Sequence, residues 1–171
     1  MGRASTKENK NIYHICREEL ELTREQASEL LGTIPPERIE RIENEKSLPH
    51  PDEVLIMSEK YKKPELRNYY CTNECPIGKK YVPELKVKDL SQIVLEIVAS
   101  LNMMQKKQER LVEITVDGTI EESEIEDFIN IQKNLEQISI TTETLKLWVE
   151  QKIAANNINV EMYNKIREGK K

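Results

Sequence analysis

Residues 22–55 read LTREQASELLGTIPPERIERIENEKSLPHPDEVL, and this segment has the clearest local signals in the chain. Thr23 stands at an N-cap position, where its hydroxyl can accept a hydrogen bond from the first helical turn. An apolar stripe at helical spacing follows and ends at Gly32, a residue suited to the left-handed conformation that terminates helices. Pro35 and Pro36 come next, and proline is tolerated only at a helix start. The segment therefore predicts two short helices joined by a tight turn.

The second of these helices has one apolar and one polar face. Ile39 and Ile42 are three residues apart and give the helix an inward side. Charged and amide residues occupy its start and its outer side: Glu37, Arg38, Glu40, Arg41 and Asn44. A helix-turn-helix needs this division, because its second helix must stand at the surface to enter a groove of DNA.

The segment resembles the lambda-repressor-like helix-turn-helix of the XRE (Cro-type) family of bacterial and phage regulators. The matching residues are Leu22-Thr23, Leu31-Gly32, Ile39, Arg41-Ile42-Glu43, Lys46, Pro49, Pro51, Val54-Leu55 and Met57. The resemblance covers about residues 10–70 and implies a five-helix head. The chain departs from the family pattern in a turn one residue longer, in two prolines that open the second helix, and at Glu45, where the family commonly has glycine.

The resemblance also implies a set of DNA contacts. Arginine can bind guanine through two parallel hydrogen bonds and glutamate can accept one from cytosine, so base contacts are expected from the second helix. Phosphate contacts are expected from the residues that flank it. The full set of expected DNA-binding residues is Thr23, Arg24, Glu37, Arg38, Glu40, Arg41, Asn44 and Lys46.

The composition favours an all-α protein. Of the 171 residues 33% are charged and only 5% aromatic, which is typical of long exposed helices rather than of a sheet-based core. No apolar run approaches the roughly 20 residues that span a bilayer, and the N-terminus lacks an apolar signal region. Three cysteines, an odd count, favour a reducing compartment over a disulfide scaffold. We expect a cytoplasmic chain without membrane contact.

Three features suggest a metal or an active site, and each has a simpler interpretation. Cys71 and Cys75 are four residues apart, and Cys16 is a third candidate ligand, but the usual paired Cys-x-x-Cys spacing is absent. Residues 113–124 place Asp117 in an EF-hand register, yet a glutamate occupies the first position, where shorter ligands are needed. No nucleophile, base or phosphate-binding motif occurs at a useful spacing. We expect no metal, cofactor, small-molecule ligand or enzyme activity.

Beyond residue 87 the pattern becomes a heptad repeat. A first a/d seam runs through Leu90, Val94, Ile97, Leu101, Met104, Gln108 and Leu111. A second runs through Phe128, Ile131, Leu135, Ile138, Thr142, Leu145 and Val149. Since this seam continues through the β-branched residues 138–142, one long helix is expected over 121–155. The connection between the two helices is short, so they must form an antiparallel hairpin.

Apolar side chains off these seams predict an interface: Ile93, Val98, Ile125, Ile129, Leu147 and Trp148. A hairpin covers only one side of each helix, and exposed apolar stripes usually mark a contact surface. We therefore expect a homodimer through residues 87–156. The expected organisation is a flexible N-terminal arm (1–10), a helix-turn-helix domain (11–70), a Cys- and Pro-containing linker (71–86), the hairpin (87–156), and a tail (157–171) in which residues 160–166 suit a short helix.

Net charge keeps two functional interpretations open. The chain carries −5 overall, with 12 basic against 14 acidic residues in residues 1–70, whereas DNA binding draws much of its affinity from phosphate contacts. The first interpretation is a sequence-specific DNA-binding transcriptional regulator that binds double-stranded DNA as a dimer. The second is a protein-interaction module that kept the fold and works through its hairpin, since the glutamates of the second helix oppose phosphate. A basic patch over that helix favours the first.

Overall fold

The computed structural model describes residues 10–116 and 118–169, and these residues form helices and connecting turns without a strand. Most of the expected N-terminal arm, and Asp117 of the calcium-like turn, lie outside the described residues. Contacts along the chain divide it into two units, residues 1–84 with 150–171 and residues 85–149. The expected all-α fold is confirmed.

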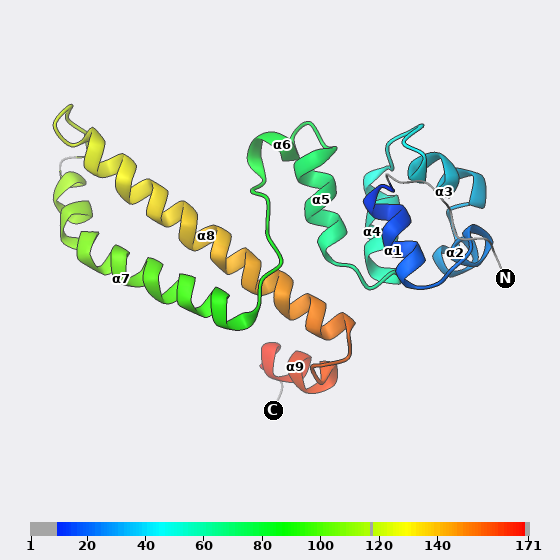
Figure 1. Cartoon of the computed structure of the whole chain (residues 1–171). Coiled ribbons are helices and arrows are strands. Elements are labelled where there is room, and N and C mark those ends of the chain that lie inside the picture. The colour runs from blue at the N-terminus through cyan, green and yellow to red at the C-terminus, as the bar shows by residue number, and fades with distance from the viewer. Residues whose placement is uncertain (1–9, 117, 170–171) are drawn as a thin grey trace. The chain divides into compact units, whose positions relative to one another are not determined.

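The first unit contains the expected five-helix head, labelled in Figure 1. Its helices are α1 (Ile12–Glu19), α2 (Arg24–Leu31), α3 (Pro36–Glu43), α4 (Pro51–Lys60) and α5 (Glu65–Asn73). All are short, between 8 and 10 residues, and none would be stable alone in water. Their packing against one another therefore determines the head.

A single apolar cluster fills the head and fixes the position of α3. Its eleven buried members are Tyr13, Cys16, Ala27, Leu31, Ile34, Ile39, Ile42, Val54, Met57, Tyr61 and Leu66. Ile39 and Ile42 are each 1% exposed, so the predicted inward face of the second helix is confirmed. Full burial of one such side chain stabilises the fold by about 1.5–3 kcal/mol, so α3 is held firmly along this side.

The segment expected as a linker contains more helix than the sequence indicated. Helix α5 continues to Asn73, and α6 (Gly78–Tyr81) follows after a turn. Gly78 allows this turn to fold back, because a Cβ at that position would lie 2.2 Å from the carbonyl oxygen of Cys71. The amide of Asn68 donates to the carbonyl of Pro83 over 2.9 Å, which ties the end of this segment to α5.

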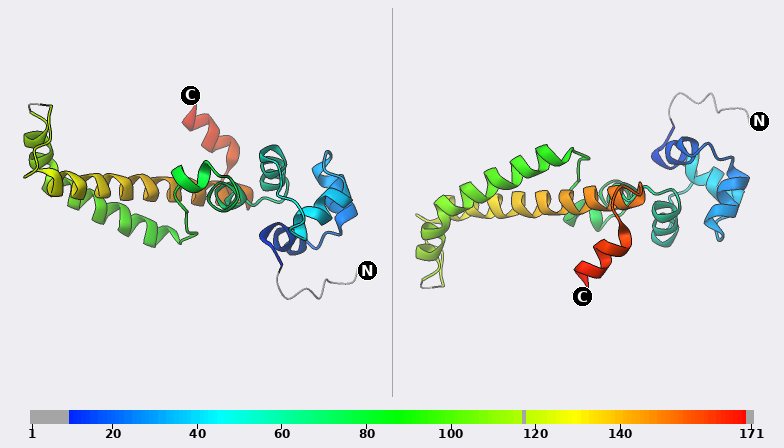
Figure 2. Two further views of the ribbon diagram at one scale, coloured as in Figure 1. Left: turned by 90° about the horizontal axis from the view of Figure 1, so that it is seen from above. Right: turned by 90° about the horizontal axis from the view of Figure 1, so that it is seen from below.

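The hairpin consists of α7 (Leu90–Ile114) and α8 (Ile125–Ala154), which lie side by side and antiparallel in Figures 1 and 2. The predicted continuous helix through residues 138–142 is confirmed. Hydroxyls there donate to carbonyls one turn earlier, from Thr141 to Gln137 over 2.7 Å and from Thr142 to Ile138 over 2.8 Å. These bonds satisfy the threonine hydroxyls in a β-branched stretch whose local conformational preference is against helix.

The seam of α7 differs from the predicted one. The least exposed positions at three-four spacing are Ile93, Ile97, Ser100, Met104, Lys107, Leu111 and Ile114. Three of the predicted positions belong to this set, but Leu90, Val94 and Leu101 are 40%, 45% and 54% exposed. Helix α7 carries two overlapping sets about a quarter turn apart. Where they differ, the less exposed residue lies one position earlier in the chain, with Ile93, Ser100 and Lys107 in place of Val94, Leu101 and Gln108.

The residues expected off the seams divide accordingly. Ile93 and Leu147 are buried, so the expectation that they stay in water was wrong. Val98, Ile125 and Ile129 are exposed as expected. A short helix, α9 (Val160–Arg167), follows α8 in the region where the sequence suited one.

Candidate nucleic-acid interface

The start of α2 is capped as the sequence predicts. The hydroxyl of Thr23 accepts from the backbone N–H of Gln26 over 3.2 Å, and the Gln26 side chain accepts in return from the N–H of Thr23 over 2.9 Å. This reciprocal pair is a capping box. It fixes the end of α2 that is expected to lie beside a phosphate.

The turn between α2 and α3 is closed by a glycine and two prolines. Gly32 has a φ of +77°, which a side chain would strain, and it ends α2. Ile34, 2% exposed, anchors the middle of the turn in the core. Pro35 then takes the N-cap position of α3 and Pro36 its first turn, where the missing N–H groups cost nothing.

The last turn of α3 is held by a buried ionic network. Glu43 is 1% exposed and accepts from Arg17 over 2.5 and 3.0 Å and from Arg24 over 2.9 Å. Arg17 also donates to the carbonyl of Leu22 over 2.5 Å. Helices α1, α2 and α3 are thereby joined at one point. The network also removes Glu43 from the acidic surface that the sequence assigned to this helix.

Arg38 is occupied by the fold. Its guanidinium donates to the two carboxylate oxygens of Glu53 over 2.7 and 2.6 Å, to the hydroxyl of Ser47 over 2.7 Å and to the carbonyl of Leu48 over 3.0 Å. These bonds hold the loop between α3 and α4. A guanidinium with its donors used in this way is poorly placed to bind guanine, so the geometry favours a positioning role.

The partner of Arg38 is also charged in the folded state. Burial opposes ionisation of Glu53, but the hydrogen bond from Arg38 and the backbone N–H of His50, at 2.6 Å, outweigh it. The pKa of Glu53 therefore lies below its usual value. A single carboxylate thus fixes both the loop after α3 and the start of α4.

Arg41 and Lys46 differ from Arg38. Both are exposed, and no hydrogen bond or ion pair engages either side chain within the described part of the chain. Glu37 is exposed as well, at the start of α3. Glu40 lies 4.0 Å from Arg24 and accepts from the amide of Asn44 over 3.4 Å, so its charge is partly compensated.

The chain leaves α3 through a left-handed residue that is not glycine. Glu45 has a φ of +57°, and the N–H of Lys46 bonds to the carbonyl of Arg41 over 2.9 Å, which is a Schellman cap. The same geometry recurs at Lys62 after α4, where Lys63 bonds back to Ser58. Glu45, which stands where the family pattern commonly has glycine, therefore adopts a backbone conformation that is strained for a residue with a side chain.

The comparisons with known proteins agree with this geometry. Residues 14–66 match the family model described as helix-turn-helix. This segment is a lambda-repressor-like helix-turn-helix domain. Comparisons with curated proteins and with solved structures returned no match.

The family that this domain matches is a DNA-binding regulatory family and not an enzyme family. The match suggests, in general terms, that the chain is a DNA-binding transcription regulator. The match ends before the hairpin. Within the helix-turn-helix domain, the capped α2, the short turn and α3 are the elements that the sequence predicted. Arg17 and Glu53 were missed, because each acts through a partner distant in the chain.

Three other expectations concern groups outside α3. In the described residues no group of three or more His, Cys, Asp or Glu is arranged to hold a metal ion. Cys16 is buried in the core, and Cys71 and Cys75 are half-buried. No helix among the described residues combines the length and apolarity that crossing a bilayer requires.

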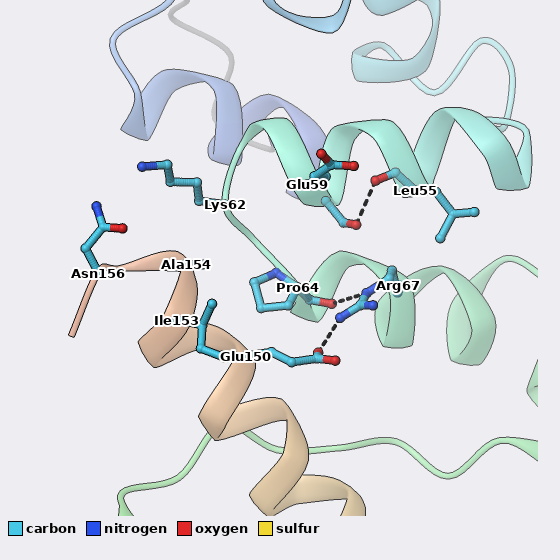
Figure 3. A pocket seen from close by; sticks show the side chains of 10 residues that line it. Leu55, Glu59, Lys62, Pro64, Arg67, Glu150, Ile153, Ala154 and Asn156 are labelled. Carbon is cyan, nitrogen blue, oxygen red and sulfur yellow. Dashed lines mark hydrogen bonds and ion pairs between the residues drawn. The ribbon is translucent and has the colours of Figure 1, made fainter. Parts of the chain in front are cut away.

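A groove lies on the first unit between α4, α5 and the last turn of α8 (Figure 3). Leu55, Pro64 and Ile153 give it an apolar floor. Arg67 bonds to the Glu150 carboxylate across it and also to the carbonyl of Pro64. The guanidinium of Arg67 is therefore engaged by protein groups within the groove.

Proposed function

We propose that this chain is a sequence-specific DNA-binding transcriptional regulator that binds its site as a dimer. One observation carries the proposal. The helix-turn-helix domain presents α3 with the guanidinium of Arg41 exposed and unengaged among the described residues, while the acidic Glu43 of the same helix turns into the core. Arginine in that position is the commonest side chain to recognise a base pair directly.

The charge on α3 is less unfavourable than the sequence indicated. Glu43 is neutralised by two arginines, and Glu40 lies near Arg24. The remaining exposed charges are mixed, with Arg41 and Lys46 opposed by two glutamates. A mixed surface of this kind gives weak nonspecific attraction to phosphate, so specificity must come from the groove contacts.

The expected DNA-binding residues take different roles in this proposal. Arg41 contacts a base, with Glu37 beside it at the start of α3. Thr23 and Lys46 flank the helix and contact phosphates. Arg24 joins them through its terminal N–H groups, because its Nε is bonded to Glu43. The remaining expected residues, Arg38, Glu40 and Asn44, bond within the protein and position α3 rather than bind bases.

Pairing of two chains supports this function because one small head offers few contacts. A dimer through residues 87–156 carries two α3 helices, and dimeric helix-turn-helix proteins recognise two half-sites about 34–36 Å apart, one helical turn of DNA. Two linked weak contacts bind far more tightly than one, since the second is intramolecular.

Selection of duplexes from a random pool tests the proposal. Wild type is expected to enrich one motif with two related half-sites, and Arg41→Ala to lose preference at one position in each half. Lys60→Ala is the matched control, because it removes one exposed positive charge from α4 of the same head. If wild type enriches no motif, the protein-interaction module is the better description and the proposal fails.

A further inference from the structure

The hairpin has much less core than the head. Of residues 85–149 as the structure describes them, only four apolar side chains are buried: Ile93, Ile114, Ile131 and Leu147. The head buries eleven in a single cluster. Long helices gain most of their stability from packing of an apolar face, so two helices with this little buried surface need a further partner.

One face of α7 supplies the missing apolar surface. Leu90, Val94, Val98, Leu101 and Val112 recur at helical spacing, and each is between 40% and 59% exposed. The positions that continue the series between Leu101 and Val112 are glutamines 105 and 108. This series, called the α7 stripe, contains no charged residue, although a third of the whole chain is charged. Depletion of charge is typical of the centre of a protein interface.

The charged groups of the hairpin lie on another side. Arg110 bonds to Asp127 of α8 over 2.8 Å and lies 3.8 Å from Glu124. At 3.6 residues per turn, Arg110 is about half a turn away from the α7 stripe. Leu135 of α8, 46% exposed, adds to the apolar surface. The hairpin therefore separates an uncharged face from a charged one.

We propose that the α7 stripe is the surface that binds a second copy of this chain, with the two α7 helices antiparallel and the two-fold axis at Leu101. Leu101 lies midway between Leu90 and Val112 along α7, so an antiparallel pair places each end of the stripe against the other and Leu101 against itself. A contact of this kind is self-complementary, as a two-fold dimer requires.

The area of the face fits a dimer. From Leu90 to Val112 the stripe is about 33 Å long, and two packed helices are roughly 20 Å wide, which gives about 660 Å² per copy. The pair then buries about 1,300 Å², within the range of specific interfaces. The product is a four-helix bundle, in which each hairpin completes the core of the other.

Sedimentation equilibrium of the full chain tests the pairing. Wild type is expected to be a dimer in the micromolar range, and Leu101→Glu, which places two carboxylates at the axis, to raise the dissociation constant by about 100-fold or more. Met103→Glu is the matched control on the same helix, because Met103 is 45% exposed but lies off the stripe. A monomeric wild type, or equal weakening by both variants, overturns the proposal. Circular dichroism confirms that each variant stays helical.

Cysteine cross-linking tests the antiparallel arrangement. In a full chain carrying Cys71→Ser and Cys75→Ser, oxidation is expected to join Leu101→Cys to itself across the axis. Leu90→Cys is expected not to self-link, because its counterpart in the second copy lies at the far end of the stripe. Efficient self-linking of Leu90→Cys indicates parallel helices and overturns the arrangement.

This inference depends on the proposed function only for the role of the dimer, which is to supply two α3 helices for two half-sites. The two fail separately. A dimer that selects no duplex leaves the α7 pairing intact and overturns DNA recognition. A monomer that selects a duplex does the reverse.

Discussion

Glu43→Gln tests whether the ionic network at the end of α3 determines how that helix is presented. The substitution removes the charge that compensates Arg17, whose side chain is 9% exposed, and Arg24. Removing one partner of a buried ion pair costs about 3–5 kcal/mol in the free energy of unfolding. Glutamine keeps one oxygen that can still accept a hydrogen bond from an arginine. We therefore expect a loss near the lower end, about 3 kcal/mol, in the free energy of unfolding.

The assay must separate the head from the hairpin. Trp148, the single tryptophan, lies in residues 85–149, whereas Tyr13 and Tyr61 are buried in the head. Urea unfolding followed by tyrosine near-ultraviolet signal reports the head, and tryptophan fluorescence reports the hairpin. The loss is expected in the tyrosine transition.

Glu37→Gln is the control for Glu43→Gln, since it makes the same chemical change on the exposed side of α3. Exposed substitutions away from special features usually change stability by within about 0.5 kcal/mol. If Glu43→Gln costs no more than Glu37→Gln, the network does not hold α3 and the reasoning is refuted.

Three further predictions concern strain, pH and thiol reactivity. Glu45→Gly and Lys62→Gly should each stabilise the head by about 1 kcal/mol in urea titrations, because both residues have positive φ, and Glu45→Gly alone should also strengthen DNA binding by removing a negative charge beside α3. The pKa of Glu53 is lowered in the fold, so its contribution to stability is fully present above the ordinary carboxylate pKa of about 4.3 and is lost as the pH falls through the folded pKa. Urea midpoints of unfolding should therefore fall over this acidic range in wild type, and fall less in Arg38→Ala. Burial raises the pKa of Cys16 to about 12, so iodoacetamide at mildly alkaline pH should label Cys16 only in unfolded protein, as peptide mass mapping would show.

Local signals made the turn of the helix-turn-helix domain predictable. The capping role of Thr23, the positive φ of Gly32 and the prolines before α3 each depend on residues within one or two turns. The identity of Glu45 as a substitute for glycine was visible in the same way, and its φ of +57° explains the family preference. Such features are set by backbone sterics and are read from short windows.

The side-chain partners were not predictable from the pattern. Arg17 reaches Glu43 across 26 residues, and Arg38 reaches Glu53 across 15. A helical-wheel projection of α3 places Arg38 and Glu43 among the polar positions. It does not indicate which polar side chains form ion pairs or hydrogen bonds within the protein. The polar positions of α3 thus predicted an exposed face, whereas two of its charged side chains, Arg38 and Glu43, form ion pairs within the head.

The hairpin shows the limit of periodicity. The predicted and observed seams of α7 share Ile97, Met104 and Leu111, and both fit a three-four repeat. Choosing between them requires knowing which side faces α8, which depends on packing and not on spacing. The displaced residues Leu90 and Leu101 then became the exposed stripe proposed as the dimer surface.

The central claim is that α3 recognises DNA sequence through Arg41, and one titration tests it most directly. Full-length wild type and Arg41→Ala are titrated by fluorescence anisotropy, at one fixed salt concentration, onto the duplex enriched by selection and onto a shuffled duplex of equal length. Wild type should bind the enriched duplex at least about 10³-fold more tightly. Arg41→Ala should lose about 1–3 kcal/mol on the enriched duplex and little on the shuffled one. Equal affinity of wild type for both duplexes, or an equal loss on both in Arg41→Ala, would contradict the account.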